Sequence, residues 1–327
     1  MKKLSLLTLG VLATAMMSGC SSSKYTIGVL LPVEHEALQL AEKGFIEGLL
    51  ESGLTKDQDY VIDEKNAGGD EASLQTLAKN LSISSDMTLG LGTGATKALK
   101  SASIDNGKTS PILFTAVTDP VAAKLVDSLD NGTGYVTGAS DAQPVLAQLS
   151  LIKEINPAAD KIGVLYTQSE ENSVEQAKQV KSLCSTLLME VETRTVSGPS
   201  DISTVANALA SIEGIDAIYV PTDNNIAANM SAVRDACNAN SVLCVCGEFG
   251  EVKTGGHISY SFDYEMLGKE TGKLAAQIIR NGKSAKDLPV VQMTADKCEI
   301  KYSSANLAGS GIELPESITS KGSDISK

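Results

Sequence analysis

The chain has 327 residues, which is enough for two domains of ordinary size, each with its own hydrophobic core. Its net charge is −13, from 40 acidic and 27 basic residues, and the basic residues form no cluster. Because nucleic acid and anionic membrane surfaces are both recognised by clustered basic side chains, we expect the protein to bind neither by charge.

The first 20 residues have the features of a secretory signal. Lys2 and Lys3 precede an apolar run over residues 4–17, which is shorter than the roughly 20 residues that a membrane span needs. The ending "MMSGC" resembles bacterial lipoprotein signals, although Met17 stands where Leu is usual. This resemblance implies cleavage before Cys20 and a lipid on its sulfur, which would anchor an extracytoplasmic protein to the cell membrane. An ordinary signal peptide with an incidental Cys is the alternative.

Short apolar strands then alternate with amphipathic helices. We predict strands over residues 26–31, 60–64, 87–91, 112–115, 161–166, 190–196, 217–220, 242–245 and 257–261. We predict helices over residues 36–52, 72–81, 121–128, 170–188, 203–212, 226–238 and 265–281. Such alternation is typical of βαβ units and parallel sheets, so the predicted fold class is α/β.

The strand–helix pattern occurs twice along the chain. "TIGVLLP" opens the first set at Thr26, and "KIGVLYT" opens the second at Lys161. We therefore predict two doubly wound parallel-sheet lobes joined by a hinge of crossing strands, because residues 135–144 look like a strand that passes directly between lobes. The predicted boundaries are residues 1–20 for the signal peptide, residues 25–140 plus 262–285 for the first lobe, and residues 141–261 plus 286–320 for the second lobe.

Two predicted strands end in the same way, in "ILFTAVTDPV" and "DAIYVPTDNN". In open parallel sheets, ligands bind beyond the carboxyl ends of the strands. We therefore expect Thr118-Asp119 and Thr222-Asp223 to form two facing edges that hold a polar molecule. Two structural roles remain open: Asp119 can shape the turn before Pro120, and Asp223 can cap the helix that follows.

The segment "GTGATKAL", residues 92–99, has glycines that allow a tight turn at the start of a helix, where free amides favour an anion such as a carboxylate. It is not a Walker loop, because Ala95 stands where that motif needs Gly. "GLGTGA" fits the dinucleotide pattern G-x-G-x-x-A, but it follows the third strand and no acidic residue lies about 20 positions further on. A plain helix-starting turn and a nucleotide-using enzyme remain alternatives.

Catalytic and metal-binding constellations are missing from the sequence. G-x-S-x-G and H-E-x-x-H do not occur, and the two histidines, His35 and His257, are far apart. Besides Cys20, the cysteines are expected to be buried reduced thiols: Cys184, Cys237, Cys244, Cys246 and Cys298. We expect no enzymatic activity, no cofactor and no metal.

Several blocks resemble the substrate-binding lipoproteins of ABC importers, in the subgroup that includes tryptophan- and other aromatic amino-acid-binding members. Among them are "VEHEALQLAEKGFIEGL", "DEKNAGGD", "FTAVTDPVAAKLV", "VTGASDAQPV", "ENSVEQ", "DAIYVPTDNNI" and "SFDYEMLGKETGKLAAQII". The resemblance spans about residues 25–317. It implies a type I periplasmic-binding-protein fold with three crossovers, a small-molecule ligand in the cleft, a monomer, and a membrane permease with its ATPase as partners.

The resemblance also implies a set of residues that line the cleft. They are Glu34, His35, Thr93, Gly94, Ala95, Thr118, Asp119, Ser140, Asp141, Asn172, Ser173, Thr222, Asp223, Asn224 and Asp263. The chain departs from the family pattern at three places. Glu36 replaces a common Pro, "GTGATKA" replaces A-T-P-A-A, and Glu248-Phe249 replaces small polar residues.

The expected ligand is a small zwitterion, an amino acid and possibly an aromatic one. The helix-start loop would hold its carboxylate, and an Asp, first of all Asp223, would hold its ammonium group. Its side chain would pack on Leu31, Val33, Leu38 and Phe249. A sugar, nucleoside or peptide ligand, or a sensor that signals to a membrane kinase, is the alternative on the same fold.

Overall fold

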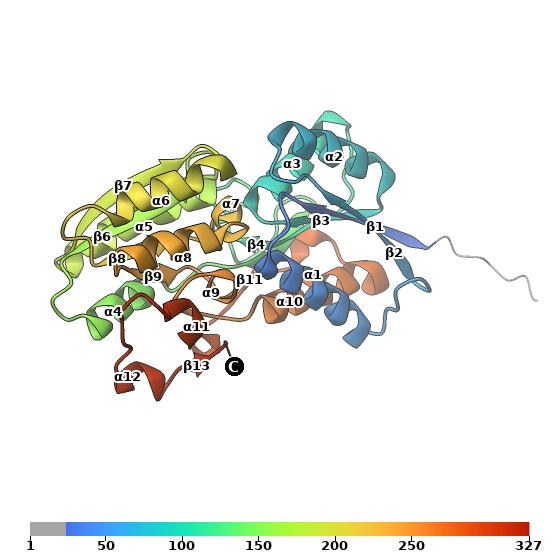
Figure 1. Ribbon diagram of the computed structural model, residues 1–327. Coiled ribbons are helices and arrows are strands. Elements are labelled where there is room, and N and C mark those ends of the chain that lie inside the picture. Colours follow the sequence, from blue (N-terminus) through green and yellow to red (C-terminus); the bar gives the residue numbers. More distant parts are fainter. Residues whose placement is uncertain (1–23, 327) are drawn as a thin grey trace, which may run out of the picture.

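The protein consists of two α/β lobes that lie side by side, as seen in a computed structural model that describes residues 24–326 (Figure 1). The predicted signal peptide and Cys20 lie outside the described residues. Within that part of the chain, none of the helices combines the length and the apolar character needed to cross a bilayer.

The first lobe is built on a six-stranded parallel sheet with the order β11-β5-β4-β3-β1-β2. Its strands are β1 (Tyr25–Leu31), β2 (Tyr60–Asn66), β3 (Met87–Leu91), β4 (Ile112–Val117), β5 (Val136–Ser140) and β11 (Val291–Gln292). Helices α1 (Glu36–Glu51) and α10 (Tyr264–Asn281) cover one face, and α2 (Glu71–Ser84) and α3 (Thr93–Asp105) cover the other. Both faces of the sheet are therefore buried, which is why its strands read as continuous apolar runs.

The second lobe has a seven-stranded sheet with the order β13-β12-β10-β9-β8-β6-β7. Its strands are β6 (Lys161–Thr167), β7 (Glu190–Val196), β8 (Ala217–Val220), β9 (Leu243–Cys246), β10 (Ile258–Ser261), β12 (Glu299–Tyr302) and β13 (Ser323–Asp324). Helices α4 (Val145–Ile155) and α5 (Glu171–Thr186) pack on one face, and α6 (Ile202–Ala210) and α8 (Met230–Ala239) on the other. The remaining short helices are α7 (Asn224–Ala227), α9 (Phe249–Thr254), α11 (Ser304–Leu307) and α12 (Glu316–Thr319). All strand pairs are parallel except β10–β12.

The chain passes between the lobes three times: after β5, after β10, and between β11 and β12. The doubly wound α/β class predicted from the sequence is confirmed. The sequence assigned residues 286–320 to the second lobe, whereas β11, inside that range, pairs with β5 of the first sheet.

Two predicted helices differ from the structure. The helix predicted over residues 121–128 is wrong: Lys124 has a left-handed φ of 58°, and the segment forms turns whose amides are held by the Asp119 side chain. The helix predicted over residues 226–238 is interrupted between α7 and α8 at Asn229, whose side-chain amide donates to the backbone oxygen of Asn225. Local hydrogen bonding of this kind competes with a continuous helix.

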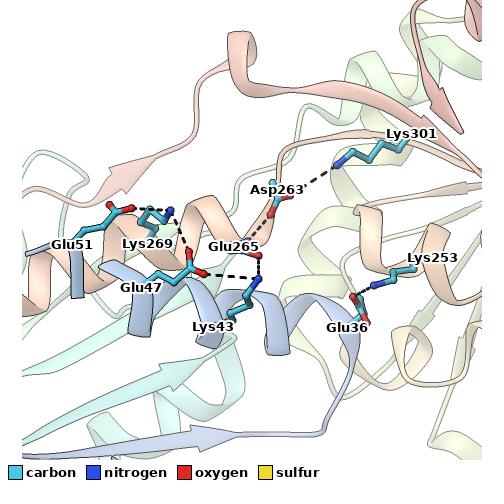
Figure 2. A network of polar contacts seen from close by, with 9 residues as sticks. All are labelled: Glu36, Lys43, Glu47, Glu51, Lys253, Asp263, Glu265, Lys269 and Lys301. Carbon is cyan, nitrogen blue, oxygen red and sulfur yellow. Dashed lines mark hydrogen bonds and ion pairs between the residues drawn. The ribbon is translucent and has the colours of Figure 1, made fainter. Parts of the chain in front are cut away.

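Helices α1 and α10 cross with their backbones in close contact. A Cβ at Gly44 would lie 1.9 Å from the backbone oxygen of Glu265, and one at Gly268 would lie 1.9 Å from that of Ala41. At Gly48 and Gly272, along the same seam, a Cβ would lie 2.2 Å from a backbone oxygen of the other helix. Ion pairs lie across it (Figure 2), among them Lys43–Glu265 at 2.8 Å and Lys269–Glu51 at 3.0 Å. The glycines therefore let the two helices pack as one unit.

Four of the cysteines, Cys184, Cys237, Cys244 and Cys246, are buried free thiols, as predicted. Cys298 is also free but only half-buried.

Candidate functional site

The two Thr-Asp edges predicted from the sequence do face each other. The Thr118 hydroxyl of the first lobe lies 3.2 Å from the Thr222 hydroxyl of the second. Beside them, His35 Nε2 lies 3.1 Å from Asn224 Oδ1, again across the boundary. The carboxyl ends of both sheets therefore meet in one interlobe cleft, in the position where open α/β sheets bind ligands.

Ion pairs join the lobes at three further places around the cleft. Lys97 of α3 pairs with Glu171 of α5. Glu36 of α1 pairs with Lys253 of α9, and Asp263 at the start of α10 lies 4.0 Å from Lys301 of β12 (Figure 2). In each pair one partner comes from each lobe. We call the Lys97–Glu171 and Glu36–Lys253 ion pairs the latch pairs. With the contacts between the edges, they show that the lobes are closed on each other.

A cavity of about 560 Å³ opens from the cleft, and we call it the outer cavity. The first lobe contributes Val33, Thr93 and Gly94 to its lining, and the second contributes Asn172 and Asn224. This volume is within the range of small-molecule sites.

A much smaller space, the inner chamber, lies deeper between the lobes. Its volume of about 10 Å³ holds roughly one water-sized group. Asn172 and Asn224 line both spaces, so the chamber adjoins the outer cavity. The full lining of the chamber is His35, Ala37, Leu38, Ala116, Asp141, Asn172, Thr222, Asp223, Asn224, Ala227, Glu248, Glu251 and Tyr264.

The start of α3 offers hydrogen-bond donors to the outer cavity. Gly92 ends the turn with a φ of 84° and provides no side-chain cap. The Thr93 hydroxyl is buried and has no hydrogen-bond partner in residues 24–326. An uncapped helix start with a spare hydroxyl can hold an anionic group.

The backbone is strained where β4 reaches the chamber. Ala116 has a left-handed φ of 57°, and the register of β4 against β5 shifts between Phe114 and Val117. Bulges and unusual φ values cluster at sites of function because they redirect the chain there.

Four buried carboxyl groups line the chamber, those of Asp141, Asp223, Glu248 and Glu251. Glu248 uses its carboxylate to cap α9 by accepting from the amides of Gly250 and Glu251. Burial raises the pKa of Glu248 to about 7. Burial, reinforced by the charge of Glu248, raises the pKa of Glu251 well above its ordinary value, and burial also raises the pKa of Asp141. Burial lowers the pKa of His35 to about 4, so its imidazole is neutral near pH 7.

The structure brings together most of the predicted site residues. Thr93, Gly94, Asn172 and Asn224 line the outer cavity, and His35, Asp141, Asn172, Thr222, Asp223 and Asn224 line the chamber. Thr118 and Asp119 border a small adjoining space with Thr93 and Asn172. Asp263 lines a separate cavity of about 250 Å³ together with Phe249 and Lys301.

Four predicted residues lie outside the linings of these cavities. Glu34 is exposed and bonds to Gln39, while Ala95 is part of the first lobe's core. Ser140 donates to the backbone oxygen of Thr118, and Ser173 is fully buried. The predicted set did not include Glu251, Tyr264 and Glu170, whose positions at the cleft follow from tertiary packing.

A metal site is not apparent either: the described residues contain no group of three or more His, Cys, Asp and Glu side chains suited to hold an ion.

Known proteins resemble the chain over nearly its whole length. The family of ABC transporter substrate binding proteins matches residues 26–325. A tyrosine-binding protein of Clostridioides difficile (strain R20291) is 36% identical over 317 residues, which cover 91% of this chain and 89% of that protein.

Two solved structures superpose on this chain to different degrees. A domain from Streptococcus pneumoniae in complex with L-Trp has a TM-score of 0.85 at 33% identity, covering 92% of this chain and 99% of its own. A ligand-free, open substrate-binding protein with adhesive properties from Clostridium difficile has a TM-score of 0.67 at 32% identity, with the same coverage. At nearly equal identity, the lobes here are arranged more like those of the L-Trp complex, in agreement with the contacts across the cleft.

Proposed function

This chain belongs to the family of ABC transporter substrate-binding proteins, and from that premise we propose that it binds an aromatic amino acid in the interlobe cleft and delivers it to an ABC permease. Its relatives include a tyrosine-binding protein and a domain solved in complex with L-Trp. The ligand would enter while the lobes are apart and would be enclosed when they close about the hinge.

One observation carries the proposal. Buried polar atoms from both sides of the cleft have no hydrogen-bond partner in the described part of the chain, and they include His35 Nδ1, Thr93 Oγ1 and Asp141 Oδ1. Buried polar groups are normally paired. A polar molecule bound between the lobes would pair them, and the outer cavity has room for its bulk.

The carboxylate of the ligand would lie at the start of α3. There the Thr93 hydroxyl and the uncapped amides are available, and Lys97 also lines the cavity. This is the position that the sequence favoured for an anion.

We further propose that the protein acts outside the cytoplasm as a monomer, anchored by lipid on Cys20. Substrate-binding proteins of importers work on that side of the membrane. Metabolic labelling with a radioactive fatty acid tests the anchor. Label should appear in the wild-type protein and disappear in Cys20→Ala, and label retained by Cys20→Ala would contradict the assignment.

A thermal-shift panel tests the ligand class. Protein beginning at Ser21 would be unfolded and refolded to remove bound ligand, then heated with each of the amino acids, common sugars, nucleosides and NAD. A ligand at a hundred times its dissociation constant adds about 2.7 kcal/mol to the free energy of unfolding. We expect tyrosine, tryptophan or both to raise the melting temperature. A shift with a sugar or nucleoside alone would overturn the proposed ligand, and a shift with NAD would favour a nucleotide-using protein.

A further inference from the structure

We propose that the inner chamber is an ammonium site, in which His35, Asp141 and Glu251 accept the three hydrogen bonds that an ammonium group donates. The inference rests on the proposed function and deepens it. It assigns one end of the ligand to named atoms, and it departs from the sequence, which favoured Asp223.

The hydrogen bonds around His35 make its Nδ1 an acceptor. Asn224 donates its amide group to Glu170 at 2.6 Å, which turns Asn224 Oδ1 toward His35. His35 Nε2 must then carry the hydrogen that this oxygen accepts, at 3.1 Å. In a neutral imidazole the other nitrogen has a lone pair, so Nδ1 can accept a hydrogen bond. It is buried and has no partner in residues 24–326.

The two carboxyl groups are each half-used. Tyr264 donates its hydroxyl to Asp141 Oδ2 at 2.5 Å, while Asp141 Oδ1 is buried and has no partner within the described chain. Glu251 Oε2 accepts the Gly247 amide at 3.0 Å, and Glu251 Oε1 is likewise unpaired in that part of the chain. Both residues are almost completely buried, at 2% and 0% exposure.

The number of unpaired acceptor atoms, the volume of the chamber and the charge of its lining all suit an ammonium group. Three unpaired acceptor atoms belong to residues that line it, and an ammonium group has three donors and no acceptor. The volume of about 10 Å³ suits one group of the size of water. The described lining residues include no Lys or Arg, so a positive charge would come from the ligand.

Asp223 is less suited to this role because its oxygens are engaged within the protein. Thr167 donates to it twice, from its amide at 2.6 Å and from its hydroxyl at 2.7 Å. The Ile226 amide donates at 3.0 Å, which makes Asp223 the N-cap of α7. These bonds fix the edge of the second lobe. They support the helix-capping role that the sequence left open for Asp223.

Asp141 is also connected to the hinge. It follows the first crossing strand, and Tyr264, its hydrogen-bond partner, follows the second. Close by, the Ser261 hydroxyl donates to the side-chain oxygen of Gln143 at 2.8 Å, joining the same two crossings. Tyr264 is therefore a positioning residue for Asp141. An ammonium group bound to Asp141 would interact with the protein at the hinge between the lobes.

Calorimetry can test the site with pairs of ligands that differ only in the ammonium group. L-tyrosine is compared with 3-(4-hydroxyphenyl)propanoate, and L-tryptophan with indole-3-propanoate. A hydrogen bond to a charged group corresponds to roughly a 10- to 150-fold change in affinity. We expect the wild-type protein to bind the amino acid at least about 10-fold more tightly than its partner compound. Asp141→Asn should lose most of this preference. Asp105→Asn makes the same chemical change at an exposed position on the far end of α3 and should keep it.

Each of the other possible outcomes contradicts a specific part of the proposal. Equal affinity of the wild-type protein for both members of a pair would overturn the ammonium site, and this result needs no variant to fold. A preference that survives in Asp141→Asn but is lost in Asp223→Asn would make Asp223 the anchor. If amino acids bind but Asp141→Asn leaves the preference intact, only this inference fails. If none of the four compounds binds, the proposed function fails with it.

Discussion

Several side chains at the cleft stabilise the lobes as well as lining the site. The carboxylate of Glu248 caps α9, and that of Asp223 caps α7. Glu170 accepts the amides of Asn224 and Asn225 at the same edge. The local role of Asp223 was foreseeable because an Asp before a helix is a common cap. The roles of Glu170 and Glu251 were not, because charged residues on a helical segment read as solvent-exposed, and their partners Asn224, Asn225 and Gly247 are brought to them only by the packing of the second lobe.

The buried acids predict a pH dependence of stability. Burial and the charge of Asp223 raise the pKa of Glu170 to about 8 in the folded protein, against 4.5 when unfolded. Between these values the unfolded state releases a proton that the folded state keeps, so stability is lost as pH rises. His35, with its pKa lowered to about 4, acts in the opposite sense, but only below about pH 6.5. From pH 6.5 to 8 we therefore expect the free energy of unfolding of the unliganded protein to fall.

Urea unfolding at pH 6.5, 7.25 and 8 measures this slope. One retained proton corresponds to at most about 1.4 kcal/mol per pH unit, and to less for Glu170 because its side chain is partly exposed. Glu170→Gln should reduce the slope, and Glu248 and Glu251, whose pKa values burial also raises, account for the part that remains. Glu213→Gln, at an exposed position, should not change it. An unchanged slope in Glu170→Gln would mean that this carboxyl group is not the source.

The Thr93 hydroxyl gives a second prediction for a single residue. Thr93→Val keeps the shape of the side chain and removes the unpaired hydroxyl at the start of α3. A hydrogen bond to a charged group contributes about 1.5–3 kcal/mol, so the amino acid should bind more weakly by that amount in a calorimetric titration. The amide of the same amino acid, which lacks the carboxylate charge, should be affected less. Equal losses for both ligands would place the carboxylate elsewhere.

At the scale of elements, the apolar core strands were predictable, whereas the short strands β11, β12 and β13 and the breaks between helices were not. β1, β3 and β8 are continuous apolar runs because both faces of each sheet are covered, and their limits agree with the sequence to within a residue. Residues 121–128 have helical periodicity, yet the side chain of Asp119 bonds the first amides into turns. The glycine seam between α1 and α10 was also not foreseen, because the sequence of neither helix indicates which other helix packs against it.

The seam predicts a large effect from one methyl group. In Gly48→Ala the new Cβ would lie 2.2 Å from the backbone oxygen of Lys269, so the helices must separate. Overpacking of this kind costs typically 1–3 kcal/mol, and we expect a loss of about that size in chemical unfolding. Gly198→Ala is the matched control, since its φ of 179° suits any residue and nothing lies within 4 Å of the new Cβ. It should be neutral or slightly stabilising. Stability unchanged in Gly48→Ala would mean that the helices can shift apart freely.

At the scale of the whole molecule, the latch pairs bias the equilibrium between open and closed lobes. Exposed ion pairs contribute about 0.2–1 kcal/mol each, so removing both should lower the closed-to-open ratio of the unliganded protein by a few-fold. Small-angle X-ray scattering should then give a larger radius of gyration for the double variant Lys97→Gln, Lys253→Gln than for the wild type.

Charge exchange provides the control for this prediction. Glu36→Lys combined with Lys253→Glu inverts one latch pair and keeps its attraction, so it should stay as compact as the wild type. High salt should expand the wild-type protein toward the double variant, because exposed charges are screened. A radius of gyration that responds to neither treatment would show that the lobes stay together without the latch pairs.

The contact between α1 and α10 also bears on the order in which the lobes can form during synthesis. Helix α1 is made early, but α10, which covers its glycine face, follows only after the strands from β6 to β10 have been made. Until then the first lobe has an uncovered apolar face. Most strands of the second sheet lie within one uninterrupted stretch, from β6 to β10, and can assemble first. The lobe that begins the chain thus stays uncovered at α1 until most of the second lobe has been made, and only β12 and β13 of the second sheet follow α10 and β11.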